Sequence, residues 1–223
     1  MPAPFLRILA LDAALGRRSV AIVAGEVTLA EASEAGDRAM GERLAPMAAA
    51  ALHSAGLAAW ELDAVAVTVG PGSFTGIRAA LALAHGIALA AGRVPVAVTV
   101  AEAMAAALPA LGARALWVAT DSRRGRVFLD IGGRLSAVPL AALAQPAGPV
   151  ALAGDAAIAV MARLAARGCD VLLTDAREVR ARDVALVAAA RLAGTLSPLA
   201  CLPLYVDPPE ARLPLGGLRP APA

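Results

Sequence analysis

Lysine and asparagine are absent from this chain, and Gln145 is its only glutamine. The missing lysine excludes whole mechanisms, because P-loop NTPases, protein kinases, pyridoxal enzymes and S-x-x-K acyl enzymes each depend on one. The two histidines and two cysteines cannot complete a tetrahedral zinc site without several carboxylates. We therefore expect the chain to carry no metal and no cofactor of its own.

Aromatic residues and net charge are also low. Aromatics make up 3% of the chain, and its 20 basic residues, all arginine, face 18 acids for a formal charge of +2. The arginines are scattered along the sequence rather than clustered. Few side chains remain for stacking on bases, so the sequence disfavours a nucleic-acid surface of the chain's own.

Long hydrophobic runs are missing, although 59% of the residues are hydrophobic and the mean hydropathy is +0.70. The longest uncharged stretch, Leu135 to Gly154, contains three prolines and cannot form a spanning helix. The sequence reaches Asp12 too early for a leader with basic, apolar and cleavage regions. Cys169 and Cys201 lie far apart in the sequence. We expect them to be unpaired thiols of a protein in a reducing compartment. We expect a cytoplasmic protein without membrane contact.

The hydrophobic periodicity predicts an α/β chain of two lobes. In the first, the expected order is three strands (6–11, 19–24, 27–32), a helix (37–56), a strand (64–69), a helix (73–91), a strand (94–98) and a helix (101–108). In the second, we expect strands at 113–120, 126–131, 150–153 and 171–173, with helices ending at 167 and spanning 183–193. The boundaries are then 1–108 for the first lobe and 109–223 for a smaller second lobe with a proline-rich tail.

One local motif is specific. Gly70-Pro71-Gly72-Ser73-Phe74-Thr75-Gly76-Ile77-Arg78 lies between a buried strand and a helix, where a glycine turn can bind an anion. The spacing is one residue longer than the dinucleotide fingerprint and lacks its downstream acid, which disfavours a Rossmann site. The alternative is structural: the turn is tight, Ser73 caps the helix, and Gly76 allows close approach to the sheet.

The helix after this motif is apolar on every side, since only His85 interrupts its small and aliphatic residues beyond Arg78. A helix that packs on a sheet needs only one apolar face. A second apolar face on the same helix therefore needs a second neighbour to cover it. That neighbour is either another part of this chain or a partner subunit, with Arg78 and His85 at the rim of the contact.

Other candidates are Asp12 at the end of the first strand and the pair Asp121 and Arg123. Asp12 could orient a phosphate or a metal-bound water. The alternative is that it only forms a turn, because aspartate is equally expected at a strand end for that reason. Asp121 and Arg123 could form a recognition pair or only a solvated turn. No Ser-His-Asp arrangement can be identified from the sequence.

Taken together, the chain resembles the bacterial TsaB (YeaZ) family, which helps to make N6-threonylcarbamoyladenosine at position 37 of tRNA. The resemblance covers essentially the whole chain, and its most specific element is the unbroken GPGSFTGIR motif. Supporting segments are the first strand with Asp12, Glu42 to Met47, Asp121-Ser122-Arg123, Gly154-Asp155, Pro203-Leu204-Tyr205 and Pro208 to Arg212.

The resemblance implies two lobes of the actin, heat-shock chaperone and sugar-kinase type, and a subunit that is not itself the catalyst. The related catalytic subunit TsaD holds a metal on an H-x-x-x-H helix, whereas Ala101 and Ala105 stand roughly at that place here. Family members pair with TsaD through first-lobe helices, the ATPase TsaE joins that pair, and isolated members often form homodimers by the same face. ATP and metal are thus expected on the partner subunits, and tRNA is expected to bind only through the complex.

The resemblance and the apolar helix together predict the site residues. The expected partner interface comprises Leu44, Met47, Ala51, Ser73, Phe74, Ile77, Arg78, Ala79, Leu83, Gly86 and Ala90. A vestigial phosphate cleft would comprise Asp12, Gly70, Gly72, Gly154 and Asp155.

The chain departs from the family pattern at several positions. It has Ala13, Met40, Ser122 and Phe128 where the family usually has Thr, His, Ala and Tyr. Loss of a hydroxyl beside Asp12 weakens a phosphate role, but a phosphotransferase or ATPase of the same fold remains the alternative function. A peptidase role has no nucleophile and base pair to support it.

Overall fold

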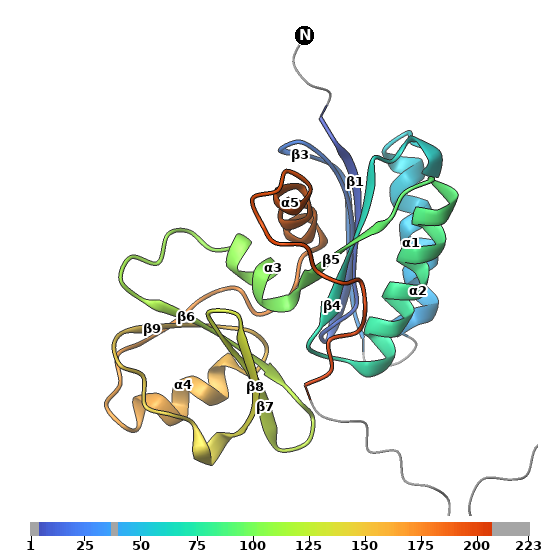
Figure 1. The fold of residues 1–223 in the computed structure, drawn as a ribbon. Helices are drawn as coiled ribbons and strands as arrows, with labels where there is room; N and C mark the ends of the chain where they lie inside the picture. Colours follow the sequence, from blue (N-terminus) through green and yellow to red (C-terminus); the bar gives the residue numbers. More distant parts are fainter. Residues whose placement is uncertain (1–4, 37–39, 207–223) are drawn as a thin grey trace, which may run out of the picture.

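The structure is a computed structural model that describes residues 5–36 and 40–206. It has two lobes, each built on a five-stranded mixed sheet (Figure 1). The first lobe contains β1 (Arg7–Asp12), β2 (Arg17–Ala24), β3 (Val27–Ala35), α1 (Met40–Ser54), a short 3-10 helix η1 (Ala59–Glu61), β4 (Ala64–Gly70), α2 (Phe74–Ala90), β5 (Pro95–Thr99) and α3 (Val100–Ala106). The expected three-strand meander and the alternation of helix and strand after it are confirmed.

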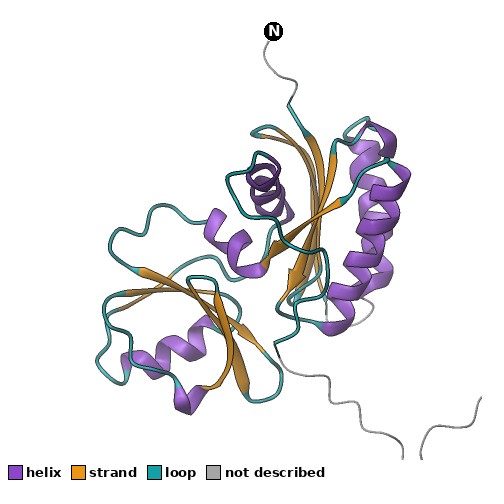
Figure 2. Ribbon diagram, in the orientation of Figure 1, coloured by secondary structure: helices purple, strands orange, loops and turns teal. Residues whose placement is uncertain are grey.

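The first sheet has the order β3-β2-β1-β4-β5, with β1 parallel to β4 and antiparallel to β2. Every residue of β4 is buried, and so are five of the six residues of β1. Strands that are apolar on both sides need cover on both faces of the sheet. Helices α1 and α2 cover one face, and α3 and α5 (Ala181–Leu192) lie on the other (Figure 2).

The second lobe contains β6 (Ala115–Asp121), β7 (Arg126–Ile131), β8 (Arg134–Pro139), η2 (Leu140–Ala142), β9 (Val150–Ala153), α4 (Ala157–Ala165) and β10 (Val171–Leu173). Its sheet has the order β10-β9-β6-β7-β8. A separate hydrophobic core forms between this sheet and the buried side of α4, which carries Val160 and Leu164.

Helix α5 lies apart from the lobe in which the sequence places it. We expected everything from residue 109 onward to belong to the second lobe, but α5 packs on β1, β2 and α3. Its buried residues, among them Val184 and Val187, belong to the first hydrophobic core. The physical reason is that the second apolar face of the first sheet would otherwise be exposed to water.

After α5 the chain stays on the first lobe as an extended strap, residues 197–206. The Arg191 Nε donates to the Ser197 carbonyl oxygen at 2.8 Å, and the Leu204 N–H donates to the Val69 carbonyl oxygen at 2.8 Å. The strap thus runs back to the end of β4, beside the GPGSFTGIR motif. Pro208 to Arg212 and the rest of the expected tail lie outside the described residues.

Among the helices within the described ranges, none combines the length and the apolar character needed to cross a bilayer.

Two glycines of α2 give a matched test of its packing. A Cβ at Gly76 would overlap the Ala13 carbonyl oxygen, whereas a Cβ at Gly86 would meet nothing within 4 Å. We expect Gly76→Ala to lower the free energy of unfolding by about 1–3 kcal/mol through overpacking. Gly86→Ala should raise it by about 0.5–1 kcal/mol, because alanine is the better helix former. Urea unfolding of both variants measures this, and equal effects at the two positions would contradict the packing.

Candidate functional site

The GPGSFTGIR motif forms a junction between β4, α2 and the turn after β1. The Ser73 Oγ accepts from the Gly76 N–H at 3.2 Å and caps α2, as expected. The Ser73 N–H in turn donates to the Ala14 carbonyl oxygen at 2.7 Å. A Cβ at Gly72 would overlap that same oxygen. The structural interpretation of the motif is therefore confirmed: the glycines let the loop close onto the turn that follows β1.

Asp12 is closed off by this arrangement. Its side chain has no exposed surface, and its Oδ1 accepts from the Thr68 hydroxyl at 2.5 Å and from the Ala14 N–H at 3.1 Å. Its Oδ2 is buried without a hydrogen-bond partner among the described residues. Burial raises the pKa of Asp12 from 3.8 to about 7, against the smaller opposing effect of these two hydrogen bonds. In this conformation Asp12 cannot contact a phosphate, which corrects that part of the predicted cleft.

The other predicted cleft residues make contacts that position the backbone of their own parts of the fold. Gly70 lies beside the strap, where an added Cβ would meet Ile77 and Leu204. In the second lobe, the Gly154 N–H donates to the Ala176 carbonyl oxygen at 2.7 Å. Asp155 Oδ1 accepts from the Asp121 N–H at 2.9 Å. A phosphate role for these residues stays a prediction.

The pair Asp121 and Arg123 forms a turn between β6 and β7. Asp121 Oδ1 accepts from the Arg123 N–H at 2.8 Å, and Arg123 has a positive φ of 57°. Both side chains are exposed. The turn interpretation of the pair is confirmed, and a recognition role is untested.

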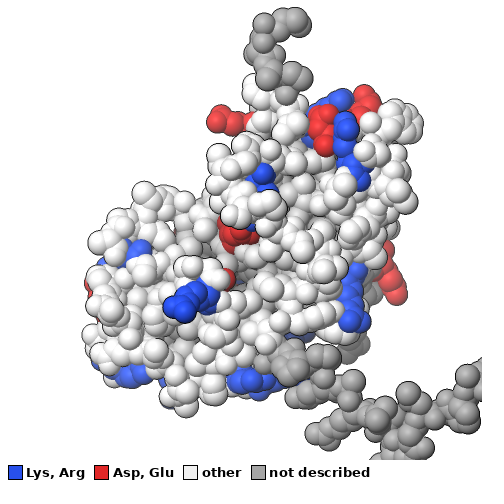
Figure 3. Space-filling model, in the orientation of Figure 1, with Lys and Arg blue, Asp and Glu red and all other residues white. Residues whose placement is uncertain are grey.

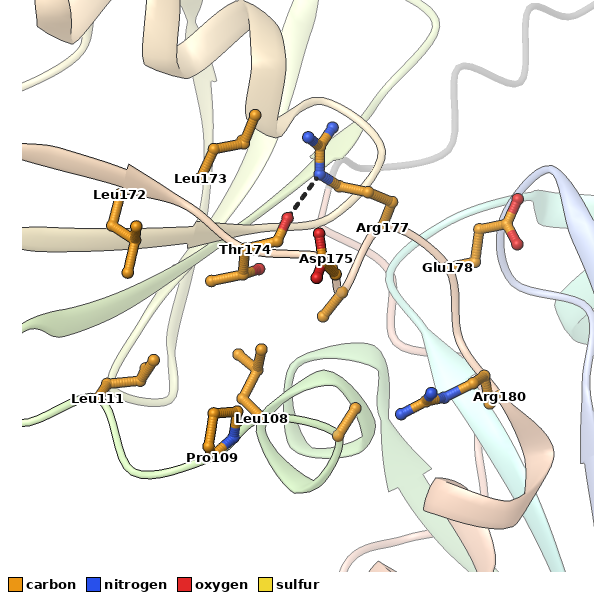
Figure 4. Close-up of a pocket in the computed structure, with 12 residues that line it drawn as sticks. Leu108, Pro109, Leu111, Leu172, Leu173, Thr174, Asp175, Arg177, Glu178 and Arg180 are labelled. Atoms are coloured by element: carbon orange, nitrogen blue, oxygen red, sulfur yellow. Dashed lines mark hydrogen bonds between the residues drawn. The ribbon is translucent and has the colours of Figure 1, made fainter.

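A cavity of about 520 Å³ opens between the two segments that connect the lobes (Figure 4). Leu108, Pro109 and Leu111 lie on one side of it, and Leu172 and Thr174 lie on the other. None of the predicted cleft residues lines this cavity. It is therefore a feature of the connection between the lobes, separate from the region of Asp12.

Helices α1 and α2 contact each other on the first sheet. Four residues of the predicted interface lie on the buried sides of these helices and therefore cannot contact a partner. Leu44, Met47 and Ala51 are 0%, 6% and 4% exposed, and Ile77 is 4% exposed. All four pack in the core of the first lobe. Helical periodicity correctly places such residues on one apolar side of each helix. That side faces the sheet, so the prediction that these four residues contact a partner is wrong.

The outer sides of the same helices remain uncovered by the described residues. Ala79 and Leu83 are half-buried, whereas Phe74, Arg78, Gly86 and Ala90 are exposed, as the predicted interface requires. We call the outer face of the two helices the α1/α2 face; its exposed small or apolar residues are Ala45, Pro46, Ala49, Ala50, Ala82, Gly86, Leu89 and Ala90. Figure 3 shows mostly uncharged surface along α2, with charged groups gathered toward its two ends.

The rim of this face carries a cluster that the sequence analysis did not assemble. The Arg78 Nε donates to the Tyr205 hydroxyl at 2.7 Å, and the Arg78 Cζ lies 3.8 Å from the centroid of the Phe74 ring. The His85 Nε2 lies 3.4 Å from the Cys201 carbonyl oxygen. The strap therefore borders the α1/α2 face along the side of Arg78 and His85.

The described residues contain no group of three or more histidine, cysteine or acidic side chains placed to hold a metal ion. Ala101 and Ala105, at the positions that resemble the metal-binding pair of TsaD, lie in α3. An alanine side chain has no ligating atom, so these two positions cannot bind a metal.

Asp12 gives a pH-dependent test. The pKa of Asp12 is about 7 in the folded protein, and its ordinary value is 3.8. Below about pH 4 Asp12 is protonated in both the folded and the unfolded chain, so it has no pH-dependent effect on stability. Between about pH 4 and about pH 7 it ionises more readily in the unfolded chain, which lowers the free energy of unfolding. Asp12→Asn keeps the acceptor and never ionises, so its stability relative to the wild type should increase from about pH 5 to about pH 8. Urea unfolding at both pH values measures this, and a difference independent of pH would contradict the burial of an ionisable Asp12.

Comparisons with known proteins agree with this geometry. The sequence model of a family described as "TsaD: tRNA N6-adenosine threonylcarbamoyltransferase" matches residues 30–177. An uncharacterised protein of Mycobacterium tuberculosis is 34% identical over 211 residues, covering 91% of this chain and 89% of that protein. The tRNA threonylcarbamoyladenosine biosynthesis protein TsaB of Escherichia coli is 35% identical over 124 residues, covering 55% of this chain and 53% of TsaB.

Solved structures extend the likeness to nearly the whole chain. YeaZ from Pseudomonas aeruginosa has a TM-score of 0.74 at 28% identity and covers 90% of this chain and 99% of that one. Component A of (R)-2-hydroxyglutaryl-CoA dehydratase from Acidaminococcus fermentans, with a TM-score of 0.51 at 12% identity over 84% of this chain and 99% of its own, shares the fold alone. The expected two-lobed actin-like fold class is thereby confirmed. Because the YeaZ structure matches nearly all of the chain, and the TsaB sequence and the model of the related TsaD family each match more than half of it, the chain belongs to the TsaB (YeaZ) family.

Proposed function

We propose that this chain is a non-catalytic subunit of the complex that forms N6-threonylcarbamoyladenosine at position 37 of tRNA, and that its α1/α2 face docks and activates the catalytic subunit TsaD. As a TsaB homologue, the chain is involved in this tRNA modification. The docking role is the finer step. It is supported above all by one observation: the outer side of two packed helices is apolar and uncovered by the described residues.

Physical chemistry supports a protein partner for such a face. Exposed apolar surface bounded by polar groups is typical of interaction sites. Small residues such as Ala82 and Gly86 let a second pair of helices approach closely. We expect the same face to pair two copies of the chain when it is alone, and TsaD to displace one of these copies. TsaE would then join the pair of subunits, with tRNA bound by the assembly.

The burial of Asp12 and its hydrogen bonds within the first lobe support an accessory role rather than a phosphotransferase. A phosphotransferase needs an acidic group in contact with a metal or a phosphate. Calorimetry of the purified chain with Mg-ATP separates the two functions: tight binding with turnover in the absence of partners would favour the enzyme.

Arginine scanning tests the docking face. Ala82 on α2 and Ala49 on α1 are exposed on it, and Ile158 on α4 of the second lobe is 56% exposed away from it. We expect Ala82→Arg and Ala49→Arg to weaken TsaD binding at least about tenfold, because a desolvated, unpaired charge opposes association. Ile158→Arg should leave the affinity unchanged. Half-buried Ala79 and Leu83 are less suitable, since a charge there also disturbs the packing of α2.

Calorimetry or surface-immobilised binding of each variant to purified TsaD gives the affinities, and thermal unfolding confirms that each variant is folded. Unchanged affinity in both face variants would remove the α1/α2 face from the complex. A loss in Ile158→Arg as large as in the face variants would show that the effect is not specific to the face.

A further inference from the structure

We infer that Arg78 is a prearranged binding group for a carboxylate of the partner that docks on the α1/α2 face, and that Tyr205 of the strap is the residue that positions it. This inference rests on the proposed function and specifies the chemistry of the partner at one edge of the contact.

Arg78 is held on two sides. Its guanidinium lies over the Phe74 ring, with the Cζ atom 3.8 Å from the ring centroid, and the Tyr205 ring centroid is 5.6 Å away. The Nε donates to the Tyr205 hydroxyl at 2.7 Å. A guanidinium fixed by stacking and one hydrogen bond loses little conformational entropy when it binds. The exposed Arg78 side chain is therefore prepared for a ligand.

Arg78 differs from the other described arginines of the first lobe in its lack of an acidic partner. Arg7, Arg17, Arg18, Arg43 and Arg93 each form an ion pair with an aspartate or a glutamate. Within residues 5–36 and 40–206, no carboxylate lies at ion-pair distance from Arg78. Since the Nε is taken by Tyr205, the two terminal nitrogens remain to donate. That geometry suits the two oxygens of a carboxylate.

The strap has anchors that do not involve Arg78. The Leu204 N–H bonds to Val69, the Ser197 carbonyl accepts from Arg191, and Leu204 and Cys201 pack against the first core. Because these contacts already hold the strap in place, the hydroxyl of Tyr205 is free to orient Arg78. Tyr205 is thus a positioning residue, and Arg78 is the group that touches the partner.

A protein carboxylate fits this place better than an RNA phosphate. Arg78 borders an uncharged helix face, and an arginine beside buried apolar contacts is a common hot spot of protein interfaces. A single-stranded RNA contact would need a free aromatic face for stacking, whereas one face of Phe74 is occupied by the Arg78 guanidinium. The Arg78 Cζ also lies over the Tyr205 ring, 5.6 Å from its centroid, and this ring is tilted by 33° to Phe74, so the two rings form no flat stacking platform.

Three variants test the inference in complex with purified TsaD. Arg78→Gln removes the charge, Tyr205→Phe removes only the hydroxyl, and Arg163→Gln removes the charge of an exposed arginine on α4, away from the face. We expect Arg78→Gln to weaken binding about tenfold and to reduce the dependence of affinity on salt between about 50 and about 300 mM. Tyr205→Phe should weaken binding by a few-fold with the salt dependence retained, and Arg163→Gln should change neither.

The outcomes separate this inference from the proposed function. Normal affinity and salt dependence in Arg78→Gln would overturn the inference, while a loss of binding in Ala82→Arg would still support docking on the face. If neither Arg78→Gln nor Ala82→Arg weakened TsaD binding, the result would contradict both the inference and the proposed docking face. Reduced binding of unmodified tRNA by Arg78→Gln with normal TsaD affinity would also overturn the inference, in favour of an RNA contact. Thermal unfolding midpoints of the three variants show whether each is as stable as the wild type.

Discussion

Helix α2 has too few polar side chains for a helix with one side on the protein surface, and the proposed docking follows from this composition. Its buried residues, including Ala80, Ala84 and Ala88, pack on the sheet. On the outer side, Ala82 and Leu89 are exposed beside α1. The described chain covers the inner side only. Water contact with the outer side is unfavourable, and a partner docked there would remove it.

The same helix begins at the loop that closes the first lobe. Ser73 caps α2 and bonds to the turn after β1, and this packing leaves Asp12 without solvent contact. One motif therefore accounts for two properties: it places the apolar helix on the surface and closes Asp12 off from solvent. The strap then reaches the same motif from the far end of the chain and fixes Arg78 beside Phe74.

The elements of the first lobe and the position of the GPGSFTGIR junction could be predicted from the local sequence pattern. Short apolar runs bounded by turn residues predicted the first-lobe strands, an apolar stretch after the glycine turn predicted α2, and the GPGSFTGIR motif marked the junction. Periodicity cannot tell which of two apolar sides faces the sheet, so Leu44, Met47 and Ile77 were predicted at the interface and are buried instead. Strand β8 lies between the expected strands 126–131 and 150–153, in a segment for which no element was predicted. The return of α5 to the first sheet and the contact between Arg78 and Tyr205, 127 residues apart, depend on tertiary packing.

Hydrogen exchange on the full chain, alone and mixed with purified TsaD, tests whether the α1/α2 face binds TsaD, because it reports which amides a partner protects. Docking on this face predicts slower exchange in α1 and α2, within residues 40–54 and 74–90, and little change in α4 of the second lobe. Protection confined to the second lobe, or unchanged exchange in both helices under conditions where the two proteins bind, would contradict it.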